Sequence, residues 1–257
     1  MQVAPGVDVC NQRCLFCWRY YDRESNLERG WDDPHNLLDG FVKGQMQLVS
    51  GFKGDDRCDI DRWKEARDPR HVAISLSGEP ALYPYLNEML EEISKRDMTS
   101  FLVTNGTVPT ALSNLTTLPT QLYITIATPD EKIYLELCRP KANYWRRIRE
   151  SLEAISALKT RRTIRHTLVR GYNMDPEMVD GYAELDSIAM PEFIEAKGYV
   201  FVGGSRYRLS MNEMPSHQEV SAFAESLADN LGYRIADEDP KSRVVLLMRK
   251  DVSSPKL

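Results

Sequence analysis

The chain has 257 residues, of which 42% are hydrophobic, and a formal net charge of −5. This length allows one large buried core. The negative net charge argues against a protein coated in nucleic acid but does not exclude a local basic face. No apolar run approaches the ~18 residues of a membrane span, so we expect a cytoplasmic protein without a membrane contact.

The first nine residues are expected to form a strand, and three cysteines follow it. Cys10, Cys14 and Cys17 have the spacing C-x3-C-x2-C, with Phe16 just before the third. A 4Fe-4S cluster has four irons, so a loop with three thiolates leaves one iron open to a ligand from outside the protein. This spacing, with the aromatic residue, is typical of radical SAM enzymes, which bind S-adenosylmethionine at the open iron.

Two other uses of the cysteines are weighed against the cluster. A structural zinc site closes with a fourth Cys or His at short spacing, whereas the nearest later candidates are His35, Cys58, His71 and Cys138. A non-enzymatic zinc module stays an alternative. Five cysteines without a signal peptide do not indicate a disulfide framework, so a reducing compartment is expected.

Beyond the cysteines, short apolar segments alternate with helical patterns, as in parallel α/β proteins. Strands are expected over 71–75, 100–104, 121–126, 163–169 and 193–196, and helices over 34–52, 86–93, 145–158, from 176 and from 216. Two further strands are expected over 233–236 and 244–248. Six parallel strands predict a partial TIM-like (β/α)6 radical SAM barrel with C-terminal helix and strand additions. We expect one domain over 1–257, with its core at about 1–200 and a C-terminal extension at about 201–257.

Polar motifs stand where the second and third of these strands end, which is where reactive loops lie in parallel α/β folds. The Gly-Glu-Pro segment after the second strand matches the segment that binds the methionine amino group in radical SAM enzymes. An ordinary turn is the alternative for each motif. The candidates for S-adenosylmethionine binding, besides Phe16, are Ser77, Gly78, Glu79, Pro80, Thr104 and Asn105.

Further candidates lie at other expected element ends. Arg139 and Lys197 are possible pocket residues without an assigned catalytic role, whereas His166, among apolar neighbours on a strand, indicates a core histidine. Residues 141–170 contain nine basic and two acidic side chains, which indicates either a solvated helix face or a surface for a polyanion. The candidates for contacts to such a polyanion are Arg146, Arg147, Arg149, Arg161, Arg162, Arg165 and Arg206.

With these residues in place, the chain closely resembles the 4-demethylwyosine synthases, the radical SAM enzymes of wyosine biosynthesis on phenylalanine tRNA. The likeness covers 10–19, 77–84, 101–106, 139–140, 167–173, 193–199 and 215–217. The resemblance implies a carbon–carbon lyase that converts 1-methylguanosine in this tRNA, with pyruvate as the two-carbon donor. It implies one 4Fe-4S cluster, S-adenosylmethionine and an electron donor of the flavodoxin or ferredoxin type. We expect a monomer.

The amino end departs from the family pattern. Family members carry an N-terminal extension with cysteines for a second 4Fe-4S cluster and a lysine thought to hold pyruvate. Nine residues precede Cys10 here, and Cys58 and Cys138 are too few to hold a second cluster. We expect either a truncated chain or a one-cluster paralogue that binds S-adenosylmethionine without condensing pyruvate. Another radical SAM enzyme, such as a glycyl-radical activase, is the alternative, and salt-sensitive tRNA binding would separate the two.

Overall fold

The computed structural model describes residues 1–21 and 30–255. Within these ranges eight strands form one sheet in the order β1-β2-β3-β4-β5-β6-β8-β7. Strands β1 to β6 pair in parallel, β8 pairs antiparallel with β6, and β7 antiparallel with β8. The strands are β1 (Gln2–Val3), β2 (His71–Ile74), β3 (Thr99–Thr104), β4 (Gln121–Thr125), β5 (Arg161–Leu168), β6 (Phe193–Gly198), β7 (Arg234–Asp239) and β8 (Val244–Met248). The partial TIM-like barrel with C-terminal additions is therefore confirmed.

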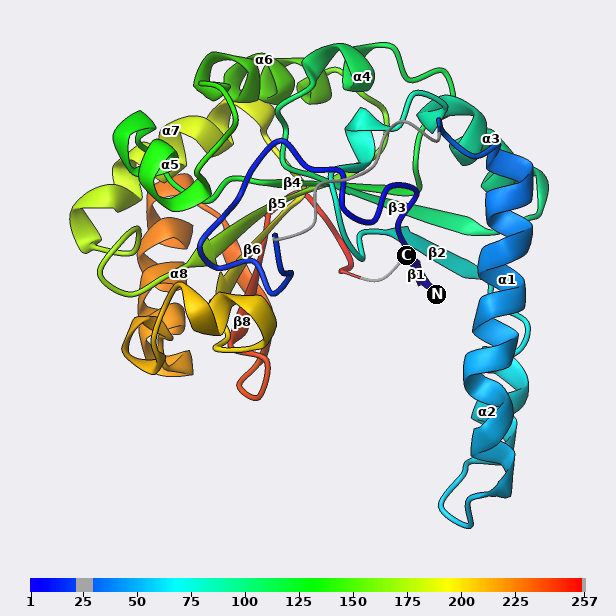
Figure 1. Ribbon diagram of the computed structural model, residues 1–257. Coiled ribbons are helices and arrows are strands. Elements are labelled where there is room, and N and C mark those ends of the chain that lie inside the picture. The colour runs from blue at the N-terminus through cyan, green and yellow to red at the C-terminus, as the bar shows by residue number, and fades with distance from the viewer. Residues whose placement is uncertain (22–29, 256–257) are drawn as a thin grey trace.

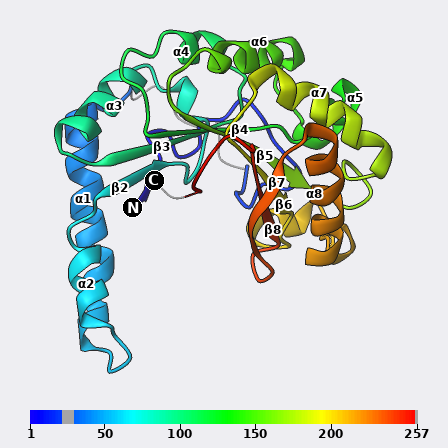
Figure 2. The ribbon, with the colours of Figure 1, turned by 180° about the vertical axis from the view of Figure 1, so that it is seen from behind.

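Helices cover the outer face of the curved sheet, while the N-terminal segment crosses its inner side (Figures 1 and 2). The helices are α1 (Pro34–Ser50), α2 (Ile60–Ala66), α3 (Leu86–Lys95), α4 (Pro109–Ser113), α5 (Glu131–Cys138), α6 (Trp145–Ser156), α7 (Val179–Ala189) and α8 (His217–Leu231). Helix α8 begins with the expected capping box between Ser216 and Glu219 and ends at Gly232, which has a positive φ. Helices α2, α4 and α5 were not predicted, because so few turns give no clear apolar period.

The alternation along β5 decides which side chains reach the barrel interior. Ile164 and His166 point towards the helices, whereas Arg165 and Thr167 border an interior cavity. The His166 ring lies 2.8 Å from the Ile126 carbonyl oxygen and 2.9 Å from an Asp186 carboxylate oxygen. His166 is therefore a core residue, as predicted.

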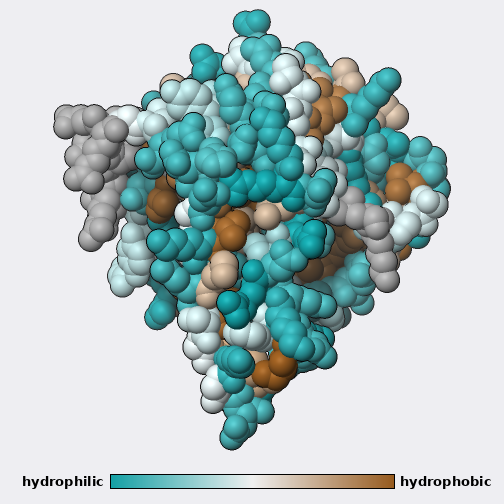
Figure 3. All heavy atoms as spheres, turned by 90° about the vertical axis from the view of Figure 1, so that its right-hand side faces the viewer, coloured by the Kyte–Doolittle hydropathy of each residue, from teal (hydrophilic) through white to brown (hydrophobic). Residues whose placement is uncertain are grey.

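Helices α1 and α2 form a hairpin that projects away from the barrel (Figures 1 and 2). Trp63 on α2 packs beneath the cationic groups of Lys53 and Arg67, at 5.3 and 4.8 Å from its ring centroid. Seen from the α1 side, the surface is mostly hydrophilic, with scattered apolar spots (Figure 3). No helix in the described ranges is both long and apolar enough to cross a membrane.

The predicted basic face is divided by the fold. Arg161 and Arg162 begin β5. They therefore lie at the amino ends of the parallel strands, whereas the cysteines lie at the carboxyl ends. The guanidinium of Arg162 is buried, where it pairs with Glu192 at 2.6 Å and donates to three main-chain carbonyl groups. Arg165 pairs with Glu195 at 2.9 Å inside the barrel. Burial therefore removes Arg162 from the expected tRNA surface, whereas the tRNA contact of Arg165, which is partly exposed beside the interior cavity, stays a prediction.

We expect Arg162→Ala to lower the free energy of unfolding by about 3 kcal/mol, because the substitution leaves Glu192 without its main cation in a largely buried position. The matched control is Arg146→Ala, which removes an exposed pair with Glu150 and should cost about 0.5 kcal/mol or less. Urea titrations followed by circular dichroism compare the two. Equal losses in both variants would contradict the buried role of Arg162.

Candidate functional site

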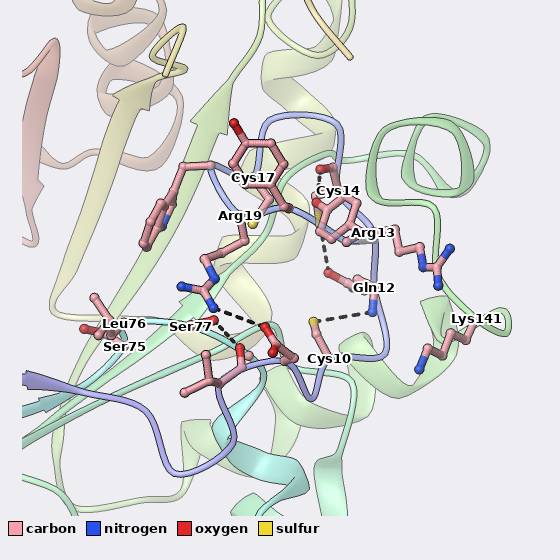
Figure 4. A pocket seen from close by; sticks show the side chains of 16 residues that line it. Cys10, Gln12, Arg13, Cys14, Cys17, Arg19, Ser75, Leu76, Ser77 and Lys141 are labelled. Atoms are coloured by element: carbon pink, nitrogen blue, oxygen red, sulfur yellow. Dashed lines mark hydrogen bonds and ion pairs between the residues drawn. The ribbon is translucent and has the colours of Figure 1, made fainter. Parts of the chain in front are cut away.

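The three cysteines of the N-terminal loop lie together at the carboxyl ends of the parallel strands. A cavity of about 460 Å³ and a second of about 270 Å³ adjoin there, and Cys10, Cys14 and Cys17 border both. Figure 4 shows these side chains around the first cavity, with Ser75 and Ser77 from the end of β2. The predicted cluster ligands therefore share one site.

The number of cysteines at the site matches the open coordination of a 4Fe-4S cluster in radical SAM enzymes. Among the residues the structure describes, no group of three or more His, Cys, Asp or Glu side chains could hold one metal ion. A zinc ion needs its ligands to converge at about 2.3 Å, whereas the irons of a 4Fe-4S cluster are separate sites that take one thiolate each. The three cysteines would hold such a cluster and leave one iron for S-adenosylmethionine.

The free thiols are held in the protonated form. Burial, with the Glu79 charge adding to it, raises the pKa of Cys10 to about 12. A hydrogen bond with the buried Cys138, followed by burial, raises the pKa of Cys14, and burial raises that of Cys17. Iron must therefore displace protons when the cluster assembles.

The Ser-Gly-Glu-Pro segment holds the chain just before Cys10. The Ser77 hydroxyl donates to the Val7 carbonyl, and the Glu79 backbone N–H donates to the Val9 carbonyl at 2.7 Å. Gly78 has a φ of 76°, and a Cβ there would overlap the Gly6 carbonyl oxygen. Only glycine permits this approach, so the segment is more than an ordinary turn.

The Glu79 carboxylate connects the ends of β2 and β3. It is buried and accepts from the Thr104 hydroxyl at 2.5 Å and from the backbone N–H groups of Asn105 and Ala81 at 2.7 and 2.9 Å. Burial raises the pKa of Glu79, although these three donors oppose the rise. Glu79, Thr104 and Asn105 all border the second cavity, as does Phe16, whereas Pro80 starts a short 3-10 turn away from both cavities.

Asn105 extends this network into the cysteine loop. Its amide group donates to the Asn11 side-chain oxygen at 3.0 Å, and the Asn11 amide donates to the Thr107 hydroxyl at 2.7 Å. Asn11 and Thr107 are both buried. The Thr-Asn-Gly motif therefore fixes the loop as well as bordering the cofactor cavity.

The end of α5 forms a further edge of the site. The Arg13 N–H donates to the Cys138 carbonyl at 3.0 Å and the Lys141 N–H donates to the Asn11 carbonyl at 2.9 Å. This pairing brings Arg13 and Lys141 to the first cavity, a placement that the sequence did not reveal. Arg139 has a positive φ of 42° and ends α5, and neither it nor Lys197 on β6 borders the two cavities.

A second unpredicted contact comes from the C-terminal part of the chain. Arg208 donates to the carbonyl groups of Leu15, Cys17 and Arg19, and its guanidinium lies 4.3 Å from the Tyr21 ring centroid. Its positive charge partly offsets the effect of burial on the pKa of Cys17. Arg208 therefore fixes the position of the third cysteine.

Gly203 and Gly204 allow the C-terminal part of the chain to pack closely against the cysteine loop. The Gly204 N–H donates to the Trp18 carbonyl at 2.6 Å, and a Cβ on Gly203 or Gly204 would overlap the carbonyl oxygens of Trp18 and Arg19. Arg206, two residues later, lies over the Phe201 ring at 5.5 Å. The glycine pair is thus explained by backbone packing.

Comparisons with known proteins agree with this geometry. The pattern of the radical SAM superfamily matches residues 5–180, and a pattern described as wyosine base formation matches residues 188–249. An S-adenosyl-L-methionine-dependent tRNA 4-demethylwyosine synthase of Pyrococcus abyssi is 46% identical over 98% of this chain and 75% of its own length. The corresponding protein of Methanocaldococcus jannaschii is 37% identical over 100% of this chain and 83% of its own.

A solved structure is similar throughout. The structure of TYW1 with a lysine-pyruvate adduct bound has a TM-score of 0.88 and 37% sequence identity, over 100% of this chain and 82% of that chain. The likeness therefore includes the barrel and the C-terminal segment that carries Arg208.

We expect Arg208→Ala to lower the stability of the cluster-free protein by about 2 kcal/mol, because hydrogen bonds from a charged donor to three loop carbonyl groups are lost. The reconstituted variant should lose iron on desalting and have a more negative midpoint potential, since a cation beside the cluster favours its reduced form. Iron analysis and spectroelectrochemistry measure both effects.

Two variants control for this result. Arg208→Lys keeps the charge and should shift the potential less than Arg208→Ala. Arg206→Ala removes a neighbouring arginine that lies over the Phe201 ring. If Arg208→Ala kept the iron content and potential of Arg206→Ala, the proposed support of the loop would be refuted.

Proposed function

The chain belongs to the family of S-adenosyl-L-methionine-dependent tRNA 4-demethylwyosine synthases, and we propose that it builds this base on phenylalanine tRNA from 1-methylguanosine, with pyruvate as the two-carbon donor. The observation that carries the proposal is the site itself. Three cysteines with radical SAM spacing border the same two cavities as Gly78, in a chain that aligns with the family over almost its whole length.

When bound, the cluster and S-adenosylmethionine supply the 5′-deoxyadenosyl radical that takes a hydrogen atom from the methyl group of 1-methylguanosine. The residues of the chain hold and orient the reactants. We assign S-adenosylmethionine to the second cavity, where Phe16 gives an aromatic wall and Thr104 and Asn105 a polar one. This leaves the first cavity, which is bordered by the charged side chains of Asp8, Arg13, Arg19 and Lys141, for the modified base.

The remaining assignments rest on the family likeness and on placement. The reaction would be a carbon–carbon lyase reaction in the cytoplasm, carried out by a monomeric single domain with electrons from a flavodoxin or ferredoxin. Arg146, Arg147 and Arg149 follow Trp145, which starts α6 and borders the second cavity, and they stay candidates for tRNA contacts. Arg161, Arg165 and Arg206 stay candidates as well. Lys197 and Arg139 stay pocket candidates without an assigned role, and neither borders the two cavities.

Anaerobic reconstitution should give about four irons per chain, with an electron paramagnetic resonance spectrum of the reduced protein that shifts on addition of S-adenosylmethionine. With tRNA that contains 1-methylguanosine, isotope from labelled pyruvate should enter the tRNA. Cys17→Ala should lose both the cluster and the labelling, whereas Cys58→Ser, on the projecting hairpin, should keep them.

Each departure from this result has a distinct meaning. Stoichiometric zinc without iron would refute the radical mechanism. A cluster that cleaves S-adenosylmethionine but leaves the tRNA unlabelled would refute the assigned reaction and point to another radical SAM activity or to the one-cluster paralogue. About eight irons would show that the ligand count from the three cysteines is wrong.

A further inference from the structure

Two cations border the first cavity without an acidic partner. Arg13 and Lys141 are both exposed, and no ion pair joins either to a carboxylate among the described residues. Figure 4 shows both side chains on the same side of the pocket, across the cysteines from Ser75 and Leu76. By contrast, Arg146 and Arg149 pair with Glu150 and Glu184. The free positive charge at the cavity therefore lies on Arg13 and Lys141, which we call the cation pair.

Exposed aromatic side chains flank the same loop after Cys17. Trp18, Tyr20 and Tyr207 are 46%, 58% and 79% exposed, and the Tyr20 and Tyr207 ring centroids lie 5.6 Å apart. Trp18 and Tyr20 border the first cavity. We call these three residues the aromatic edge.

Arginines alternate with these aromatic residues along the chain. Arg19 lies between Trp18 and Tyr20, stacks over the Trp18 ring at 5.2 Å and pairs with Asp8 at 3.1 Å. Arg206 directly precedes Tyr207. Aromatic faces interleaved with cations are the combination that proteins use for single-stranded nucleic acid, where bases stack and phosphates are neutralised. A protein partner would instead require a continuous apolar patch, with charged residues depleted at its centre.

We propose that the cation pair and the aromatic edge form one binding surface for an unpaired RNA strand that crosses the first cavity. Arg13 and Lys141 contact its phosphates, and Trp18 and Tyr207 stack on bases next to the reacting guanosine. This inference rests on the proposed function, and it assigns the contacts to residues outside the basic stretch at 141–170, except for Lys141.

The position of the cysteines inside the cavities explains why an RNA substrate would need a stacking surface at the cavity mouth. The three cysteines are only partly exposed and lie within the cavities, so a base must leave the stack of its loop to approach a cofactor held there. Leaving the stack also exposes the faces of the neighbouring bases. Aromatic side chains at the mouth of the cavity replace the lost stacking, and each such contact changes affinity by about tenfold or more.

The test measures binding of a fluorescent anticodon stem-loop that contains 1-methylguanosine to the full chain, over a series of KCl concentrations. Tyr207→Ala should weaken binding by about tenfold without changing the salt slope, and Tyr207→Phe should restore it, because stacking needs the ring and not the hydroxyl group. The combined Arg13→Ala and Lys141→Ala variant should reduce the salt slope by about one to two, since two phosphate contacts are lost. Phe52→Ala and Lys43→Ala, on the projecting hairpin, are the matched controls and should bind as the wild type does.

A second readout reports stacking directly. With 2-aminopurine next to the guanosine, binding to the wild type should change the fluorescence of this base, and Tyr207→Ala should reduce the change. A fully paired stem without the loop should bind equally to the wild type and Tyr207→Ala.

The inference and the proposed function fail in different ways. If the wild type binds the stem-loop but Tyr207→Ala binds like Phe52→Ala, or weakens binding of the paired stem equally, the stacking surface is refuted while the function stands. If the wild type does not bind the stem-loop at any salt concentration, both are refuted.

Discussion

The cysteine loop depends on hydrogen bonds from other parts of the chain, because it makes almost no regular secondary structure of its own. Backbone N–H and C=O groups in such a segment still need partners. The Glu79 N–H binds one flank, the Asn105 amide reaches Asn11, the carbonyl of Cys138 accepts from Arg13, and Arg208 donates to Cys17. The site is therefore complete only when residues from 10 to 208 have come together. The positions of the cluster ligands thus depend on the folding of most of the chain.

The sequence predicted the parts of the site that have local patterns. The six parallel strands follow from short apolar segments, and the cysteines follow from their spacing. Arg208 and Lys141 have no such signal, because their roles arise from contacts across more than a hundred residues. We predicted a tRNA contact for Arg162 because a sequence shows the charge of a residue but not its burial. The alternation that places Ile164 under the helices also places Arg162 there, and this pattern could have excluded it.

The strand-end motifs have two roles in this structure. Ser77 and Glu79 were predicted as cofactor contacts, yet their polar groups also hold Val7, Val9, Thr104 and Asn105 in place. The buried Glu79 carboxylate satisfies three donors, which would all lose their partner if it were removed. Loss of activity on substitution of Glu79 would thus not by itself identify a contact to S-adenosylmethionine.

Two neighbouring residues, Tyr207 and Arg208, connect the proposed RNA-binding surface with the cysteine loop. Arg208 points inward to the carbonyl groups of the cysteine loop, whereas its neighbour Tyr207 is largely exposed beside Tyr20. Both lie in the region that matches the wyosine base formation pattern, outside the general radical SAM match. A base stacked on Tyr207 would therefore be placed relative to the cluster through a few main-chain bonds rather than through a mobile side chain. On the proposed function, this is how a segment specific to the family could set the distance between an RNA base and a cofactor loop shared with many other enzymes.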